Sequence, residues 1–333
     1  MNQKTSGEKM NYIVFDLEWN QSHIGQAGEH PRMPFEIIEI GAFKLNKKYE
    51  TIGEFRRLVC PKLYPKLHRY IKEILNYDEE DLKRKGVDFK SACTDFLEWC
   101  KEDLPEGEEY RFCTWGVSDL NCLQNNMDFY KMEKLPFPIR YYDIQQIFSE
   151  KYLKDGKVCK LEKAVERLKL KQERPYHAAI NDAFYTSMII QKGHLGKFED
   201  KYIFDMYRHP KEASDEIMDY HNGIIDQITI DYPSKKDAMK NQDVNRVYCP
   251  KCGRITTGRI KWFHLNNGSQ VAVGKCLRHG NMMATIKFKP SSVSSSNVFV
   301  VKKIEPIKKK KYKEVLFKRD RLLEKRKIIK DPS

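Results

Sequence analysis

The hydrophobic and polar positions near the start of the chain predict three strands. Tyr12–Phe15 is a continuous run of aromatic and β-branched residues, which is typical of a buried strand. Residues 35–45 begin as an apolar-rich run and end in alternation, so they predict a helical turn that passes into a second strand. Residues 49–59 alternate and predict a third strand. Short turns join these stretches, which favours an antiparallel meander.

Helical spacing of apolar residues dominates the next part of the chain. It predicts two short helices, a longer one with an apolar stripe, and an amphipathic helix with i, i+3, i+4, i+7 spacing. A buried-type strand at 111–117 ends at Gly116, and Ser118-Asp119 stands where the N-cap of a following helix belongs. The helical stretches are 67–75, 79–84, 89–101 and 160–170, and a further helix opens near His177 and continues to about residue 191.

The second half of the chain changes character twice. Residues 193–247 are mixed and punctuated by Gly, Pro and Asn, so we expect helices that pack on the first domain and grade into a connector. From Tyr248 the composition changes, and residues 290–297 are rich in serine, as linkers are. The predicted organisation is a flexible N-terminus (1–10), an α/β domain (11–195), a helical extension (196–247), a small β module (248–289), and a Ser-rich linker with a basic tail (290–333).

Length and composition limit the class of protein. The 333 residues, 40% hydrophobic and 32% charged, suit a soluble protein with one sizeable core and a smaller module. No apolar run reaches the length that spans a bilayer, and the first ten residues lack the apolar core of a signal peptide. We therefore expect a cytoplasmic protein without a membrane span. Nine cysteines in that compartment argue against a disulfide framework and leave metal binding open.

Positive charge is concentrated at the end of the chain. Residues 302–330 hold 14 Lys or Arg and 4 Asp or Glu, so this tail carries +10 of the formal net charge of +14. A basic tail on a nearly balanced body suggests a polyanionic partner, most simply nucleic acid. A solvated, disordered charge run and a basic amphipathic helix on a membrane or a ribosome are the competing interpretations.

Four carboxylates occupy positions that suit metal binding. Asp16 and Glu18 follow the first apolar run at i, i+2, which places both side chains on one face of a strand. Two such carboxylates repel each other, and a divalent cation would offset that repulsion. Asp119 stands at a strand-to-helix junction, and Asp182 stands at a helix start, five residues after His177. Each of these residues alone would be an ordinary cap or surface group.

Together, the order D-x-E, D, H-x4-D resembles the DEDDh family of 3′–5′ exonucleases. The three motifs are FDLEW, WGVSDLNCL and YHAAINDAF, and the resemblance covers residues 11–191. Within the family, the wording FDLEWNQ, EIIEIGAFKL and WGVSDL is most similar to the branch that contains KapD and the enhanced-RNAi exonucleases, which favours RNA. The resemblance implies a ribonuclease H-like mixed sheet flanked by helices.

The resemblance also implies two divalent cations and a division of roles. Two Mg²⁺ or Mn²⁺ ions about 3.5–4 Å apart stabilise the attacking and leaving oxygens of phosphodiester cleavage, and hard oxygen ligands select these metals. Asp16 would bridge both ions, Glu18 and Asp182 would hold the one that activates water, and Asp119 would support the other. His177 would be the general base, since an imidazole titrates near neutral pH.

Two further residues are candidates to bind the terminal nucleotide. Backbone groups around Leu17 could donate hydrogen bonds, and the ring of Trp19 could stack on a base. Trp19 could equally belong to the core.

A second constellation predicts zinc. Cys249-x2-Cys252-Gly and Cys276-x2-His279-Gly are two matching knuckles around an Asn266-Asn267-Gly268 turn. Three thiolates and one imidazole give closed tetrahedral coordination, so we expect one structural Zn²⁺ in a zinc-ribbon-like module. Basic residues interleave with aromatic ones here, which suits a nucleic-acid contact: Arg254, Arg259, Lys261, Trp262, Lys275 and Arg278.

The sequence therefore predicts a metal-dependent 3′–5′ exonuclease acting on single-stranded 3′ ends, with RNA favoured over DNA. The basic tail could add a contact with a ribosome or structured RNA. Two other hypotheses stay open: an exonuclease for single-stranded DNA, and a catalytically idle regulator that binds nucleic acid or ribosomes.

Overall fold

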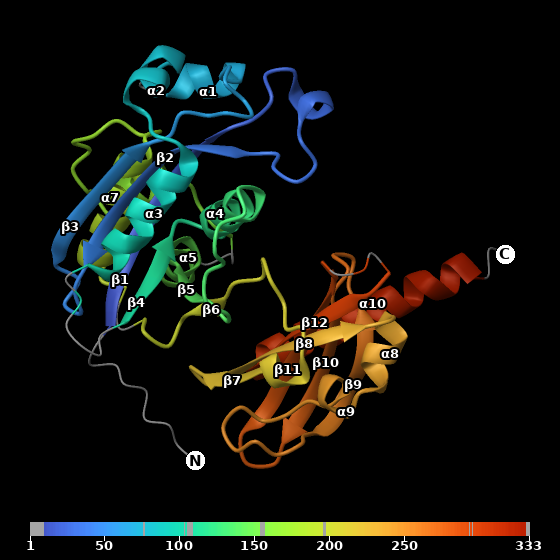
Figure 1. Ribbon diagram of the computed structural model, residues 1–333. Coiled ribbons are helices and arrows are strands. Elements are labelled where there is room, and N and C mark those ends of the chain that lie inside the picture. The colour runs from blue at the N-terminus through green and yellow to red at the C-terminus, as the bar shows by residue number, and fades with distance from the viewer. Residues whose placement is uncertain are drawn as a thin grey trace. The chain divides into compact units, whose positions relative to one another are not determined.

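The chain folds into two compact units, residues 1–207 and 208–333, each with its own six-stranded sheet (Figure 1). A computed structural model describes residues 10–75, 77–102, 104, 109–153, 157–195, 198–292, 294 and 296–330, with side chains described as far as residue 324. The expected flexible N-terminus lies outside the described residues except for Met10, which begins the first strand.

The first unit is built on a mixed sheet of order β3-β2-β1-β4-β5-β6. Strand β1 is antiparallel to β2 and parallel to β4, and β2 is antiparallel to β3, which confirms the early meander. The strands are β1 (Met10–Asn20), β2 (Glu36–Leu45), β3 (Thr51–Leu58), β4 (Glu109–Thr114), β5 (Arg140–Asp143) and β6 (Ile203–Phe204).

Helices cover both faces of this sheet. Ile13, Phe15 and Leu17 of β1 pack in a core cluster with residues of α3 and α4, whereas α7 packs on β2 around Phe43. Figure 1 places α3 and α7 on opposite faces. The helices are α1 (Arg69–Ile74), α2 (Glu79–Lys85), α3 (Phe89–Lys101), α4 (Ser118–Phe129), α5 (Ile144–Tyr152), α6 (Leu161–Arg167) and α7 (Ala179–Lys192), and a 3-10 turn, η1, spans Gly25–Gly28.

The helical turn expected at the start of residues 35–45 is wrong. Glu36–Leu45 is one strand, and all ten of its residues are buried. A central strand covered on both faces has no polar side, so its sequence reads as a continuous apolar run that periodicity cannot distinguish from a helix.

The second unit is an antiparallel sheet of order β7-β8-β12-β11-β10-β9. Its strands are β7 (Ile217–His221), β8 (Ile224–Tyr232), β9 (Thr257–His264), β10 (Gln270–Cys276), β11 (Gly280–Pro290) and β12 (Val298–Ile307). Its helices are η2 (Ala213–Asp215), α8 (Lys235–Lys240), α9 (Gln242–Asn245) and α10 (Lys309–Lys330).

The helical extension expected at 196–247 is therefore wrong for its central part. Residues 217–232 form the β7–β8 hairpin. Its turn residues Asn222 and Gly223 both have positive φ, at 45° and 69°, which is the geometry that a two-residue hairpin turn requires. The Asn-Gly pair is the sequence signal for this hairpin.

The boundary expected between the β module and a tail is also wrong. Strand β12 pairs with both β11 and β8, and Ser291 and Asn297 join in a backbone hydrogen bond of 3.0 Å, so this serine-rich stretch connects two strands. Two consecutive lysines make the sequence of β12 resemble the start of a basic tail. Lys302 is nevertheless fully buried and donates to the carbonyls of Asp243 and Arg246 at 2.6 and 2.7 Å. Only the part of the basic tail after Ile307 is helical, as α10.

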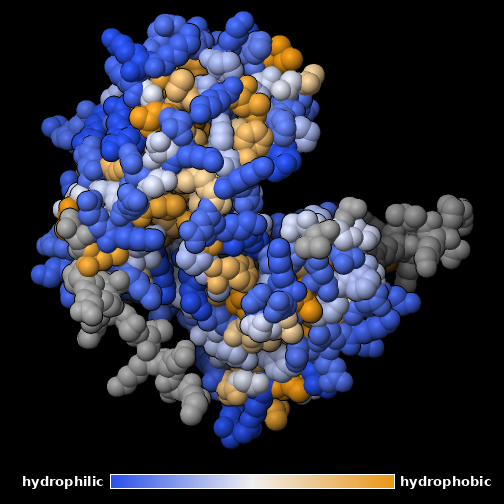
Figure 2. All heavy atoms as spheres, in the orientation of Figure 1, coloured by the Kyte–Doolittle hydropathy of each residue, from blue (hydrophilic) through white to orange (hydrophobic). Residues whose placement is uncertain are grey.

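The surface on the face drawn in Figure 2 is mainly hydrophilic, with small separate apolar patches. Within the part of the chain that the structure describes, no helix is long and apolar enough to cross a membrane.

Candidate active site

Three of the four predicted carboxylates meet in the first unit. Asp16 and Glu18 lie on the same face of β1, and Asp182 lies in the first turn of α7. One carboxylate oxygen from each of these residues lies within 4.8 Å of the others. The i, i+2 spacing and the helix start therefore place these groups as the sequence predicted.

Gly41 on β2 lets α7 approach the sheet this closely. It pairs with Asp16 in the β1–β2 register. A Cβ atom at this position would clash with the backbone of Ala179 and Ile180 at the start of α7. The missing side chain thus allows Asp182, in the same first turn of α7, to lie close to Asp16.

Asp119 lies at the start of α4 and is almost fully buried. Its Oδ1 accepts a hydrogen bond of 3.1 Å from the backbone N–H of Leu17, the residue between Asp16 and Glu18. The expected N-cap, Ser118, is instead the first helical residue, and the preceding Val117 makes no side-chain cap bond. The bond to Leu17 shows that the side chain of Asp119 is directed at β1.

Burial raises the pKa values of all four carboxyl groups. Burial is the largest cause in each case, and the neighbouring carboxylates add to it at Asp16 and Glu18. The pKa of Glu18 rises to about 8, those of Asp119 and Asp182 rise to about 7, and that of Asp16 rises well above its usual range. In the absence of a cation the cluster therefore favours bound protons at neutral pH.

The donor set suits a hard divalent cation. It consists of carboxylate oxygens alone, the ligands that Mg²⁺ and Mn²⁺ prefer. Oδ1 of Asp182 is buried and has no hydrogen-bond partner among the described residues, so it is free to ligate. The positive charge of a cation would favour the ionised carboxylates and so oppose the effect of burial and repulsion on their pKa values.

His177 lies on an exposed turn immediately before α7. Its φ is +63°, in the left-handed region, and its backbone N–H donates to Oδ2 of Asp182 at 3.3 Å. The backbone of this residue is thus tied to the carboxylate cluster while its side chain faces solvent.

The two residues expected to bind a nucleotide have other contacts. The N–H of Leu17 is committed to Asp119, so it is not a free donor. The ring of Trp19 is partly buried, packs against the core cluster of the first unit, and lies 6.0 Å from the ring of Phe35. The alternative that Trp19 belongs to the core fits these contacts.

Sequence reasoning missed a fifth carboxylate. Glu39 pairs with Glu18 across the β1–β2 ladder and is fully buried. It forms an ion pair of 2.9 Å with Arg56 and accepts a hydrogen bond of 3.5 Å from the N–H of Ile180 at the start of α7. Burial and Glu39 raise the pKa of the nearby Tyr77 hydroxyl. Glu39 thus links β2, β3 and α7 beside the cluster, and its only signal in the sequence is a charge in the middle of a mainly apolar strand.

The predicted zinc ligands also meet, in the second unit. Cys249, Cys252, Cys276 and His279 each place one ligand atom within 4.8 Å of the others. Sγ of Cys249 lies 3.4 Å from Nδ1 of His279, and the sulfurs of Cys252 and Cys276 lie 3.7 Å apart. Zn–S bonds of about 2.3 Å would place two sulfurs of a tetrahedral site about 3.8 Å apart, so the four groups fit Zn²⁺.

The backbone around this cluster favours a thiolate. Burial raises the pKa of the Cys276 thiol, but hydrogen bonds from the backbone of His279 and Arg278 and from the side chains of Cys249 and Cys252 together lower it to about 6. Gly253 and Gly280, which close the two knuckles, have φ of +67° and +83°, where a side chain would be strained.

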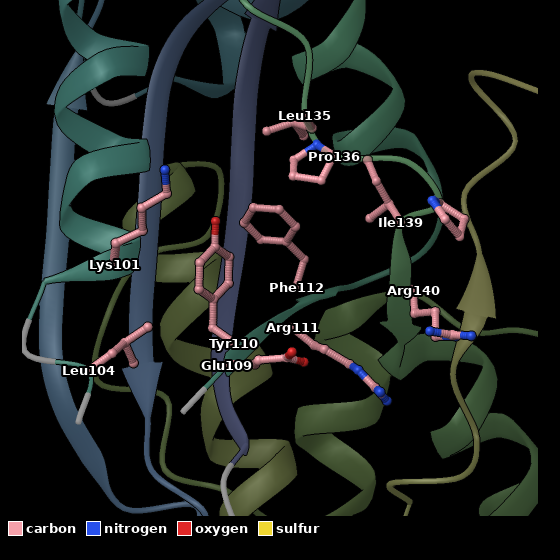
Figure 3. A pocket seen from close by; sticks show the side chains of 11 residues that line it. Lys101, Leu104, Glu109, Tyr110, Arg111, Phe112, Leu135, Pro136, Ile139 and Arg140 are labelled. Atoms are coloured by element: carbon pink, nitrogen blue, oxygen red, sulfur yellow. The ribbon is translucent and has the colours of Figure 1, made fainter. Parts of the chain in front are cut away.

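A pocket of about 510 Å³ in the first unit is distinct from the carboxylate cluster (Figure 3). Tyr110 and Phe112 of β4 line it together with Leu135 and Pro136. In the parallel ladder Tyr110 lies beside Asn11, five residues before Asp16. The pocket therefore lies at the opposite end of β1 from the carboxylates.

Three partly buried carboxylates, with the buried Asp119 beside them, form a candidate site for divalent cations on a mixed sheet. Residues 13–190 match the model of the family described as Exonuclease (RNase_T), a span of more than half the chain. The chain belongs to this exonuclease family and is therefore a nuclease of the hydrolase class, and its mixed sheet with helices on both faces agrees with the predicted ribonuclease H-like fold.

Other comparisons give more distant likenesses. No curated protein matches the chain. Among solved structures, the nuclease domain of 3′hExo, described as a DEDDh family member bound to rAMP, is 19% identical, with a TM-score of 0.49 and coverage of 60% of this chain and 98% of that one. Cell-death related nuclease 4 is 18% identical, with a TM-score of 0.45 and coverage of 54% and 62%. An E. coli ExoI–ssDNA complex is 11% identical, with a TM-score of 0.44 and coverage of 56% and 42%.

Proposed function

We propose that this protein is a metal-dependent exonuclease that removes nucleotides from single-stranded 3′ ends, with RNA favoured over DNA. The observation that carries the proposal is the convergence of Asp16, Glu18 and Asp182 within 4.8 Å, with Asp119 bonded to the intervening Leu17. The preference for RNA rests on the resemblance to the KapD and enhanced-RNAi branch. A cytoplasmic location stays a prediction.

The carboxylates would hold two Mg²⁺ or Mn²⁺ ions. Asp16 would bridge them, Glu18 and Asp182 would hold one, and Asp119 would support the other. When bound, these ions supply the positive charge that stabilises the developing charge on the phosphate and eases deprotonation of the attacking water. Gly41 and Glu39 support this arrangement, because they set the approach of α7 to the sheet.

His177 is the proposed general base, which takes the proton of the attacking water. Its position supports this role in two ways. Its backbone bond to Asp182 keeps it beside the cluster, and its exposed side chain has no hydrogen bond among the described residues that would have to break first.

The second unit would hold one structural Zn²⁺ through Cys249, Cys252, Cys276 and His279, because a site with four protein ligands leaves no open position. We further propose that the lysines and arginines of α10 bind the nucleic-acid backbone, since that contact needs no sequence readout. Structured RNA or a ribosome could supply the same polyanion.

The test compares matched single-stranded RNA and DNA, each labelled at the 5′ end, with Mg²⁺, Mn²⁺ or EDTA. The wild type should give metal-dependent ladders, faster on RNA, and His177→Ala should lower kcat about 10²–10⁴-fold. Faster loss of DNA would establish a deoxyribonuclease instead. Binding of either polymer without degradation would point to a nucleic-acid-binding regulator.

A further inference from the structure

The end of the catalytic strand carries a buried asparagine that organises a surface loop. Asn20, two residues after Glu18 on β1, is fully buried. Its Nδ2 donates to the carbonyls of Tyr64 and Lys66, both at 2.8 Å, and its Oδ1 accepts from the N–H of His68 at 2.9 Å. One side chain thus holds three points of the segment 64–68 against the end of β1.

A buried carboxylate on the neighbouring strand holds the adjoining residues 62–64, so the two side chains together clamp the segment 62–68. Glu36 faces Asn20 in the β1–β2 ladder and is 1% exposed. It accepts hydrogen bonds of 2.7–3.0 Å from the backbone N–H groups of Lys62, Leu63 and Tyr64, and one of 2.8 Å from the hydroxyl of Tyr130. Burial of a carboxylate costs free energy unless donors surround it, so these bonds fix the loop to the sheet.

The clamped segment ends at His68, whose partly exposed ring pairs with the exposed ring of Tyr70. Nδ1 of His68 accepts from the backbone N–H of Tyr70 at 3.3 Å, which orients the imidazole. The two rings stack with centroids 5.7 Å apart at 22°, the Arg69 guanidinium lies 5.5 Å from the Tyr70 ring, and Tyr70 is 62% exposed. Figure 1 places α1, which begins at Arg69, at the end of the sheet where β1 ends.

The charges around this pair are mainly positive. Lys62, Lys66 and Arg69 are all exposed. Arg69 pairs with Glu73 at 3.6 Å, while Lys66 has no ion pair among the residues that the structure describes. A phosphate backbone passing this surface would meet cations, and a base would meet an aromatic face.

We propose that His68, Arg69 and Tyr70, with Lys66, form a substrate subsite that binds the single strand beyond its terminal nucleotide. This inference rests on the proposed function and adds to it a second point of contact. An unpaired base would stack on the Tyr70 ring, and Lys66 and Arg69 would contact the flanking phosphates. Asn20 and Glu36 are positioning residues, because they hold the subsite on the strand that carries Asp16 and Glu18.

The test compares an oligonucleotide with a substrate too small to reach the subsite, the p-nitrophenyl ester of a nucleoside 5′-monophosphate. Tyr70→Ala should raise KM for a single-stranded 12-mer about 5- to 150-fold, the range for loss of one stacked base, and leave turnover of the ester unchanged. Tyr70→Phe keeps the ring and should match the wild type. Tyr220→Ala, which removes a half-exposed tyrosine of β7, is the matched control and should also match it.

A binding measurement separates this inference from the proposed function. If the wild type turns over neither substrate, the proposed function fails, and fluorescence anisotropy of a labelled 12-mer at 0.15 M salt then tests the subsite alone. Tyr70→Ala should weaken that binding by a similar factor. Equal KM or Kd for Tyr70→Ala and the wild type, with both correctly folded, would overturn the subsite whether or not the protein is a nuclease.

Discussion

At the scale of single residues, the carboxylate cluster lowers the stability of the fold that contains it. Burial and the neighbouring charges raise the pKa values of Asp16 and Glu18, so each ionised group costs free energy when no cation is present. We predict that Asp182→Asn lowers nuclease activity about 100-fold or more, because loss of a ligand exceeds the 10–100-fold typical of residues that only orient ligands. The melting temperature of the metal-free variant at pH 8 should equal or exceed that of the wild type.

Glu98→Gln, on the exposed side of α3, is the matched control and should leave both activity and melting temperature unchanged. A large loss of stability in Asp182→Asn would show that this carboxylate supports the fold by contacts instead of serving a cation.

The same pKa values predict how stability depends on pH. In the unfolded chain these carboxyls titrate near pH 4, whereas in the fold Glu18 titrates at about 8 and Asp119 and Asp182 at about 7. Because the folded pKa values are the higher ones, protonation stabilises the fold. That contribution is complete below about pH 4 and is lost as the pH rises through 7 to 8.

Thermal unfolding of protein dialysed free of Mg²⁺ should therefore show a falling melting temperature between pH 5.5 and 8.5. Added Mg²⁺ or Mn²⁺ should reverse the fall at pH 8.5, and Asp182→Asn should show a smaller fall than the wild type. Identical pH profiles for the two proteins would contradict the assigned repulsion.

The sequence predicted the candidate ligands but not the residues that support them. Asp16, Glu18, Asp119 and Asp182 could be found because their spacing and flanking elements resemble a family pattern. Asn20 and Glu36 carry no such pattern, since a polar residue at a strand end usually faces water. Their burial depends on the segment 62–68, which folds over them from further along the chain.

At the scale of elements, the contact between β2 and α7 sets the geometry of the site. Gly41→Ala should force α7 away from β1, because the new Cβ would meet the backbone of Ala179 and Ile180, which cannot move independently. We predict a loss of about 1–3 kcal/mol in the free energy of unfolding and a fall in activity larger than in stability. Denaturant unfolding and turnover of the mononucleotide ester measure the two effects.

Gly258→Ala on β9 is the control, since a Cβ there meets no atom within 4 Å and the glycine has no positive φ. Wild-type activity in a folded Gly41→Ala protein would mean that the close approach of α7 is not needed for the site.

Helices and strands could be predicted where one face is solvated, but not where both faces are buried or a charged residue is buried. The stripe of Phe89–Lys101 gave the helix α3 with its bounds. Strand β2 is buried on both faces, so hydrophobic periodicity cannot distinguish it from a helix. Strand β12 contains the buried Lys302, so a charged residue stands where the pattern of a strand would require an apolar one. The β7–β8 hairpin was missed although Asn222-Gly223 signals its turn.

At the scale of the whole molecule, the two candidate metal sites belong to different units. All five catalytic candidates lie in residues 1–207, and all four candidate zinc ligands lie in residues 208–333. We predict about one equivalent of zinc per chain, which Cys249→Ser should lose. The melting temperature of the second unit should then fall by roughly 10 °C or more, because zinc binding contributes directly to folding.

Turnover of the mononucleotide ester by Cys249→Ser should stay near that of the wild type, since the carboxylates proposed to hold the catalytic cations lie in the other unit. Cys159→Ser, outside both clusters, is the control for the loss of a thiol. Equal zinc content in Cys249→Ser and the wild type, by elemental analysis, would remove the zinc assignment.

The most direct test of the central claim, a carboxylate-dependent 3′–5′ exonuclease, is the fate of one RNA in two forms. A 5′-labelled linear 20-mer and the same sequence closed into a circle are incubated with Mn²⁺ and either the wild type or Asp182→Asn. We predict that the wild type shortens the linear strand from its 3′ end in one-nucleotide steps and leaves the circle intact, and that the variant does neither. Cleavage of the circle, or equal degradation of the linear strand by Asp182→Asn, would contradict the account.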